Sequence, residues 1–438
     1  MSERPTAGAP AAFRLPERTD LTLGNGLRAT FVEYGAVPKA FVRVALRAGA
    51  MNEPENASGL AVLASRYLKE GAGDLDSGEL AARIARCGGR LDTHADDDDS
   101  TLDVQVLSES TPEALRLLGE VVTRPRLPEA ELERLRAELL RELAVASTQP
   151  DVLALERFHA ALYGDHPYAR VLPAREHVEA LGIEDVRGFV AGELGAARAH
   201  VYVAGRFDVA AAEQALREAF EGLGAGPEPL IAPPSPRSER AIHLVDRPGA
   251  EQSTIRLGLP APDPSHEDYL PLTVVDTLLG GAFMSRITLN LREDKGYTYS
   301  PRSTLAVHYR DACWMHASDV TTAHTGDSLH EIFAEIERLR AEPPPAEELE
   351  GVQRYMAGGM LVRNATPAGL LGQLGFLDFH ELGASYAEQY VDRVYAVTPQ
   401  QVRDLAAAYL RPEEMTIAIV GDASVIREQI APYGAITT

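Results

Sequence analysis

Short stretches of alternating apolar and polar residues predict the strands of this chain. Residues 41–50 (FVRVALRAGA) and 100–109 (STLDVQVLSE) both follow this period-two pattern. In the second stretch Leu102, Val104 and Val106 share one face. Because such strands are apolar on one face only, we expect mostly antiparallel sheets with helices packed on one face, which is an α+β fold class.

Helical periodicity is clearest in two stretches of the first half. Residues 58–73 (SGLAVLASRYLKEGAG) predict a helix that begins at a Ser58 cap and stops at Gly71. Residues 128–147 (PEAELERLRAELLRELAVAS) predict a longer helix. Its leucines form one apolar stripe: Leu132, Leu135, Leu139 and Leu143.

A proline-rich segment divides the chain into two parts of similar length. Five prolines lie within residues 226–237, which favours an extended and fairly stiff linker. Residues 1–18 are rich in proline and alanine and lack periodicity, so we expect a flexible arm there. The remaining residues, 19–225 and 238–438, are predicted to form two domains.

The two predicted domains are related to each other. Residues 182–209 align without a gap with residues 398–425, at an offset of 216, and Gly205 then matches Gly421. Both segments have the pattern of a helix followed by an apolar strand that ends at the glycine. A helix–strand unit repeated at the end of each half indicates a duplicated domain.

Composition and charge exclude several classes of function. The formal net charge is −23, so neither nucleic acid nor an anionic membrane surface is an expected partner. Only two cysteines are present, which excludes a disulfide scaffold. No apolar run is long enough for a membrane span, and the N-terminal sequence lacks the apolar core of a secretory signal. We therefore expect a cytoplasmic location.

Several motifs, in the right order, resemble the insulinase-type zinc peptidases, and most closely the short two-domain members related to mitochondrial processing peptidase. The similar stretches are NGL at 25–27, AGAMNEPENASGLAVLASRYLKEGAG at 48–73, YGDHPYAR at 163–170 and DYLPLTVVDTLLGGAFMSRITLNLREDKGYTYS at 268–300. The resemblance spans about residues 20–425. It implies two related α+β domains that face each other like a clam around a peptide-binding chamber.

The chain departs from this family at the zinc site. Active members carry H-x-x-E-H on the helix after Gly-Leu-Ala, where two histidines bind zinc and the glutamate activates water. Here Val62 and Arg66 stand at the histidine positions and Ser65 at the glutamate position. Glu142 matches the third ligand of the family, and Leu135 replaces an acid that supports the site. We therefore expect no catalytic zinc in this chain, and an ion pair between Arg66 and Glu142.

The second half keeps another part of the family's machinery. In two-chain members one subunit supplies the zinc site and the other supplies an arginine and a tyrosine, which here match Arg292 and Tyr299. Tyr297 is an alternative source of the hydroxyl group. The resemblance implies a non-catalytic subunit that is inactive on its own. It would bind peptide in a heterodimer with a homologous chain that carries the zinc.

Other functions stay open at this point. The chain could be a scaffold or peptide-binding protein of the same fold with no role in proteolysis, or an enzyme of unrelated chemistry. His308, His316 and His324 recur every eight residues but lie too far apart along a strand to share a metal ion. His166 is predicted to be a structural turn residue, and the acidic run at residues 96–99 a solvated hairpin tip.

Overall fold

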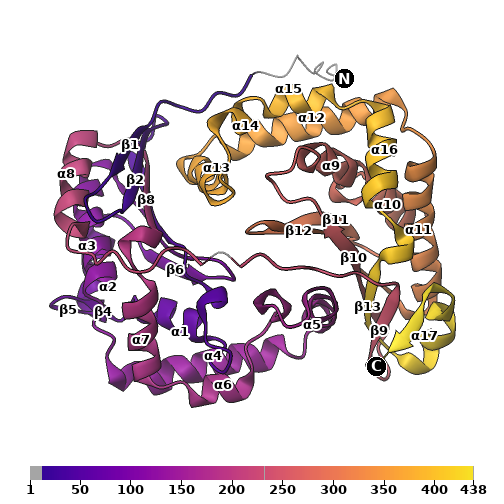
Figure 1. The fold of residues 1–438 in the computed structure, drawn as a ribbon, viewed down its shortest axis with the longest axis horizontal. Helices are drawn as coiled ribbons and strands as arrows, with labels where there is room; N and C mark the ends of the chain where they lie inside the picture. Colours follow the sequence, from indigo (N-terminus) through magenta and orange to yellow (C-terminus); the bar gives the residue numbers. More distant parts are fainter. Residues whose placement is uncertain (1–11, 231, 438) are drawn as a thin grey trace, which may run out of the picture.

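Two six-stranded sheets form the frame of the molecule (Figure 1). The computed structural model describes residues 12–230 and 232–437. The first sheet consists, in order across it, of β1 (Thr19–Thr22), β2 (Arg28–Glu33), β8 (Ala199–Gly205), β3 (Lys39–Leu46), β7 (Ser100–Leu107) and β6 (Leu91–Ala95). The second consists of β14 (Ala435–Thr437), β9 (Ala241–Asp246), β13 (Thr416–Gly421), β10 (Gln252–Ala261), β12 (Asp311–Thr321) and β11 (Arg302–His308). The two remaining short strands, β4 (Gly71–Ala72) and β5 (Leu75–Asp76), pair with each other.

Five strands of one sheet match five strands of the other in order and direction. β2 and β8 run parallel, as do β9 and β13, and every further neighbour is antiparallel in both sheets. Only the last strand differs, because β1 is antiparallel to β2 whereas β14 is parallel to β9. The expected α+β fold with two related halves is therefore confirmed.

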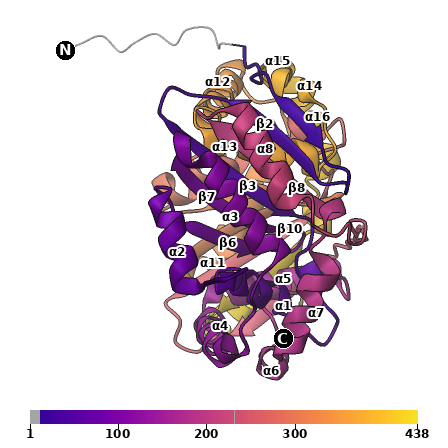
Figure 2. The ribbon, with the colours of Figure 1, turned by 90° about the vertical axis from the view of Figure 1, so that its left-hand side faces the viewer.

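Helices cover the outer face of each sheet, and one helix also lies on each inner face. Those of the first half are α1 (Leu60–Tyr67), α2 (Ser77–Arg86), α3 (Thr111–Thr123), α4 (Leu132–Ala146), α5 (Pro150–Tyr163), α6 (Arg175–Ala180), α7 (Ile183–Glu193) and α8 (Val209–Phe220). Those of the second half are α9 (Tyr269–Asp276), α10 (Arg286–Thr288), α11 (Thr325–Ala341), α12 (Ala346–Arg363), α13 (Pro367–Phe379), α14 (Ala384–Glu388), α15 (Tyr390–Ala396), α16 (Pro399–Tyr409) and α17 (Ala423–Ile430). Figure 2 shows α3 and α8 lying across the strands of the first half. Each layer of helices and its sheet enclose one large apolar core.

Each half contributes one helix that packs on the inner face of the other half's sheet; these are the two exchanged helices, α5 and α13. Helix α5 belongs to the first half in sequence but packs on β10 and β13 of the second sheet, and α13 packs reciprocally on β3 and β8 (Figure 1). On α5, Phe158 is fully buried in this contact. It lies so close to β10 that a Cβ on Gly258 would be 3.1 Å from its ring. The inner face of each sheet is therefore covered by a helix from the other half.

The start of helix α1 differs from the expectation. Ser58 does not cap it, because the N-cap is Gly59 in the left-handed conformation. The free backbone N–H groups of Gly59 and Ala61 instead donate to Glu53 Oε1, at 3.0 and 2.9 Å. The Ser58 hydroxyl contacts His177 Nδ1 at 2.9 Å. A carboxylate from the preceding loop thus satisfies the donors that the serine was expected to bind.

One stretch of the second half is long and apolar enough to cross a membrane by length and composition. It runs over Tyr269–Asp294, and 56% of its most apolar window is buried inside the protein. Its two valines and all its leucines except Leu289 belong to the apolar core of the second half. The helical conformation is also interrupted between Gly281 and Arg286. The packing is that of a core segment.

Candidate functional site

The family's zinc positions lie on α1 and α4, which contact each other. Val62 is partly buried against the first core, and Ser65 is buried with no hydrogen-bond partner for its hydroxyl among the described residues. Arg66 reaches Glu142 on α4 and forms an ion pair at 2.5 Å. The expected ion pair is thus confirmed, and the four matched positions come together in space.

The ion pair does not serve to neutralise a buried carboxylate. The Glu142 side chain is 64% exposed, so water solvates the carboxylate, whereas the Arg66 side chain is only 19% exposed. Zinc does not fit the donor set, because valine offers no donor atom and the guanidinium of Arg66 is a fixed cation. Leu135, at the supporting acid position, is buried and apolar. Within residues 12–230 and 232–437, no group of three or more His, Cys, Asp or Glu side chains is arranged to hold a metal ion.

Removing the charge of Glu142 is expected to have little effect on stability. Glu142→Gln should lower the free energy of unfolding by less than about 1 kcal/mol, because the carboxylate is largely solvated and a glutamine oxygen can still accept a hydrogen bond from Arg66. Urea denaturation of both proteins at low and high salt measures this difference. A loss well above this limit would show that the pair is more strongly shielded from water than its exposure indicates.

A cavity of about 1400 Å³ lies between the start of α5 and the inner face of the second sheet. Arg292 and Tyr299 both line it, as do residues from the loop before α10 and from β10, β11 and β12. None of its lining residues comes from α1 or α4, so the cavity is separate from the former zinc position. The resemblance implies that Arg292 and Tyr299 bind peptide, and both belong to the lining of this cavity.

Arg292 is held in place by its neighbours. Its guanidinium carbon lies 3.8 Å from the centre of the Phe283 ring, a cation–π contact, and its Nε donates to Glu293 at 2.7 Å. Tyr299 is 87% exposed and free to contact a ligand. An anchored guanidinium and an exposed phenol that line the same cavity can both donate hydrogen bonds to a peptide carbonyl group.

The second tyrosine of this segment lies elsewhere. Tyr297 packs against the second core and stacks on His324, with ring centres 4.3 Å apart. It does not line the cavity. Neither tyrosine lies on a regular strand, because β11 begins only at Arg302. The geometry therefore favours Tyr299 over Tyr297 as the hydroxyl that faces the cavity.

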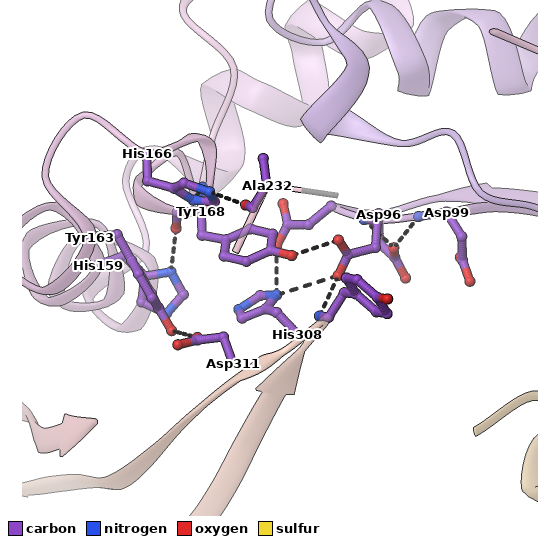
Figure 3. A network of polar contacts seen from close by, with 12 residues as sticks. Asp96, Asp99, His159, Tyr163, His166, Tyr168, Ala232, His308 and Asp311 are labelled. Carbon is purple, nitrogen blue, oxygen red and sulfur yellow. Dashed lines mark hydrogen bonds and ion pairs between the residues drawn. The ribbon is translucent and has the colours of Figure 1, made fainter. Parts of the chain in front are cut away.

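The acidic run at residues 96–99 is not a solvated tip, as Figure 3 shows. Tyr168 donates to Asp98 Oδ1 at 2.6 Å, and the backbone N–H of Tyr309 donates to Asp98 Oδ2 at 3.2 Å. His308 Nδ1 lies 3.5 Å from Asp97 Oδ2. The hairpin of the first sheet thus docks against the β11–β12 turn of the second. These contacts form a polar junction between the two halves.

His166 is the structural turn residue that the sequence indicates. Its Nδ1 accepts from the backbone N–H of Tyr168 at 3.3 Å, and its Nε2 lies 2.8 Å from the carbonyl oxygen of Ala232 in the linker. A second contact joins the linker to the first half, because Arg198 donates to the Glu228 carbonyl at 2.8 Å. The linker is therefore fixed to the first half at several points.

The junction should make stability depend on pH through Asp97. Burial, with repulsion from Asp96 and Asp98, raises the pKa of Asp97 to about 7. Burial lowers the pKa of His308 to about 4, so this imidazole is neutral at pH 8 and cannot neutralise the carboxylate. A raised carboxyl pKa means that the folded state holds a proton that the unfolded state releases. The protonated Asp97 carboxyl group therefore makes its full contribution to the free energy of unfolding below about pH 4, and this contribution is lost as the pH rises through 7.

Asp97→Asn is accordingly expected to raise the free energy of unfolding by about 1–2 kcal/mol at pH 8, and the gain should disappear near pH 4. About a third of the Asp97 side chain is exposed, and solvent screening reduces the effect to this range. Urea unfolding across pH 4–8 measures it. Asp92→Asn, at an exposed position of the same hairpin, is the matched control and should show no such trend. An equal pH profile in both variants would contradict the assignment.

Arg247, Arg256 and Arg302 line the cavity, and all three were missed in the sequence. Arg256 on β10 and Arg302 on β11 both line it, together with Asp151 at the start of α5. The signal for Arg256 was present, since a charged residue interrupts the apolar run STIRLGLPA. No sequence signal placed Asp151 there, because its helix packs on the sheet of the other half.

Comparison with known proteins agrees with this fold. A family model described as "Insulinase (Peptidase family M16)" matches residues 32–174, and one described as "Peptidase M16 inactive domain" matches residues 180–356. An uncharacterized zinc protease of Mycobacterium tuberculosis is 26% identical over 430 residues and covers 94% of each chain. The non-peptidase homolog YmxG of Helicobacter pylori is 22% identical, covering 90% of this chain and 91% of that protein.

A solved structure shows the same architecture. The crystal structure of a peptidase M16 inactive domain from Pseudomonas fluorescens superposes with a TM-score of 0.85 and 25% identity, covering 92% of this chain and 98% of that one. The two family models together span most of this chain, and the fold agrees over nearly its whole length. The chain therefore belongs to the insulinase (M16) family of peptidases, as a member without the H-x-x-E-H motif.

Proposed function

We propose that this chain is the non-catalytic subunit of a two-chain zinc peptidase. In this proposal it binds and orients peptide for a homologous partner that carries the zinc. One contrast supports the proposal. The zinc positions Val62, Ser65 and Arg66 offer no ligand, whereas Arg292 and Tyr299 remain on the wall of an open cavity.

The proposed role follows from the chemistry of the two side chains. A guanidinium and a phenol both donate hydrogen bonds to a peptide carbonyl oxygen, and they stabilise the negative charge that develops on it when the bond is attacked. The cavity also reaches the start of β11, which is the edge strand of its sheet. An extended peptide that pairs with this edge would pass both donors.

The test is an activity assay with the assembled pair. The partner is a related chain with an intact H-x-x-E-H, isolated by co-purification from the native host. Hydrolysis of a fluorogenic peptide should require both chains, and the chain alone should show no hydrolysis that a chelator abolishes. Arg292→Ala and Tyr299→Phe should each lower turnover about 10- to 100-fold while leaving the pair assembled.

Tyr297→Phe is the matched control, because it removes a hydroxyl from the same segment but outside the cavity. It should leave turnover unchanged. Full turnover in both the Arg292 and the Tyr299 variants would refute the proposed role.

The second candidate is a scaffold or peptide-binding protein without any role in proteolysis. The name of the Helicobacter pylori relative, a non-peptidase homolog, favours it. Peptide binding that depends on Arg292, with no partner that hydrolyses peptides, would support this candidate over the first.

A further inference from the structure

Arg256 is a buried cation whose side chain has no hydrogen-bond partner within residues 12–230 and 232–437. The residue is only 7% exposed and lines the cavity that holds Arg292 and Tyr299. Its Nε is buried and unpartnered among the described residues. The nearest carboxylate oxygen, on Asp151, lies 3.9 Å from its Nη2, which is beyond hydrogen-bonding distance. Burying a guanidinium without a hydrogen-bond partner costs desolvation free energy, and a ligand that pairs with it would offset that cost.

The duplicated fold contains a matched counterpart of this residue. Arg256 on β10 is paired in register with Ala418 on β13, and Arg43 on β3 is paired with Tyr202 on β8. Tyr202 and Ala418 correspond at the offset of 216 that relates the two halves. Arg43 and Arg256 therefore occupy equivalent positions on the inner faces of the two sheets.

The two arginines differ in what faces them on the next strand. Arg43 faces Asp103 and donates to both of its carboxylate oxygens, each at 2.7 Å. Arg256 faces Ala317 in the equivalent position, and Arg302 lies on the far side of Ala317. The hydrogen bond to Asp103 raises the pKa of Arg43, whereas burial and the charge of Arg302 lower that of Arg256. The second half thus keeps the cation and lacks its carboxylate.

The rest of the cavity fits a negatively charged group with an apolar neighbour. Four arginines and three acidic residues line it, although the chain as a whole carries a formal charge of −23. The N-terminal end of α5 adds its positive dipole at the rim. The wall of the cavity includes exposed aromatic side chains: Phe283, Tyr299 and Tyr355.

We propose that this cavity recognises a carboxylate of the bound peptide and that Arg256 is the residue that holds it. The carboxylate takes the position that Asp103 occupies beside Arg43, over Ala317 and between Arg256 and Arg302. The proposal rests on the peptide-binding role proposed above and specifies its substrate class, peptides with an acidic residue or a free C-terminus at this subsite.

The test measures binding of three fluorescein-labelled peptides to the purified full chain by fluorescence anisotropy. One has an internal glutamate and an amidated C-terminus, one is neutral with a free C-terminus, and one is neutral and amidated. At least one of the two carboxylate peptides should bind about 10- to 100-fold more tightly than the neutral amidated one. The peptide that gains affinity identifies the source of the carboxylate.

Two variants test the role of Arg256, one by removing its charge and one by giving it a carboxylate partner within the protein. Arg256→Gln removes the cation, and Ala317→Asp supplies an internal carboxylate at the position equivalent to Asp103. Both should abolish the preference for a carboxylate. Ala317→Asn has the same shape as the aspartate without its charge and should keep the preference. Arg157→Gln removes an arginine at an exposed position of α5 outside the cavity and should keep it as well.

The outcomes separate this proposal from the proposed function. Equal affinity for all three peptides, or a preference that survives both Arg256→Gln and Ala317→Asp in folded protein, overturns the proposal. If the neutral peptide still binds in an Arg292-dependent manner, the peptide-binding role survives that result. A carboxylate preference that depends on Arg256, together with an overall peptide affinity that Arg292→Ala leaves unchanged, supports the subsite and contradicts the peptide-binding role given to Arg292.

Discussion

Phe158→Ala is expected to lower the free energy of unfolding by about 3–5 kcal/mol. Phe158 is fully buried between α5 and the inner face of the second sheet, where it packs with Leu162, Cys313 and Ala418. Truncation leaves a cavity that its neighbours cannot fill, because the ring lies directly against the backbone at Gly258. The effect should be large because this helix joins the first half to the second.

Urea unfolding followed by far-ultraviolet circular dichroism and by tryptophan fluorescence measures this loss. The chain has one tryptophan, Trp314, which is fully buried in the second half. Its fluorescence therefore reports on the sheet that α5 covers. Phe283→Ala is the control, since this ring is 72% exposed and its loss should change stability by no more than about 0.5 kcal/mol. A Phe158 variant as stable as this control would contradict the described packing.

Restoring the three missing groups is expected to restore zinc binding. The variant Val62→His, Ser65→Glu, Arg66→His recreates the i, i+4 spacing that presents two imidazoles on one face of α1. It also releases Glu142 from its ion pair with Arg66, which leaves a carboxylate available at the same place. The variant should retain about one zinc ion per chain after gel filtration, whereas the parent chain should retain none in stoichiometric amount.

Elemental analysis of the eluted protein measures the zinc content. Adding Glu142→Ala to the variant should sharply reduce the bound zinc, because the third ligand is then lost. A triple variant that folds but binds no zinc would show that α1 and α4 are not spaced as a zinc site requires. The site would then have lost its geometry as well as its ligands.

The sequence predicted the strands well where burial follows the residue pattern. The stretches 41–50 and 100–109 correspond to β3 and β7, and Val42, Val44 and Leu102 are fully buried on one face as expected. The leucine stripe on α4 is also confirmed at Leu135, Leu139 and Leu143. In these elements local periodicity and tertiary burial agree.

Features that depend on contacts between distant segments could not be predicted in this way. The free N–H groups at the start of α1 donate to Glu53 rather than to Ser58, because the loop before the helix folds back onto it. The acidic run is partly buried because Tyr168 and Tyr309 reach it from other parts of the chain. The cavity depends on α5 packing on the sheet of the other half, and an apolar stripe does not specify which sheet it covers.

The exchange of α5 and α13 has a consequence for how such a chain could have arisen. A protein of half this length, with one sheet and one exchanged helix, would bury its inner sheet face only by pairing with an identical copy. Gene fusion would then join two such copies through the linker without changing the interface. Once fused, the two copies could diverge separately, so that one retained Asp103 opposite its arginine and the other came to have Ala317.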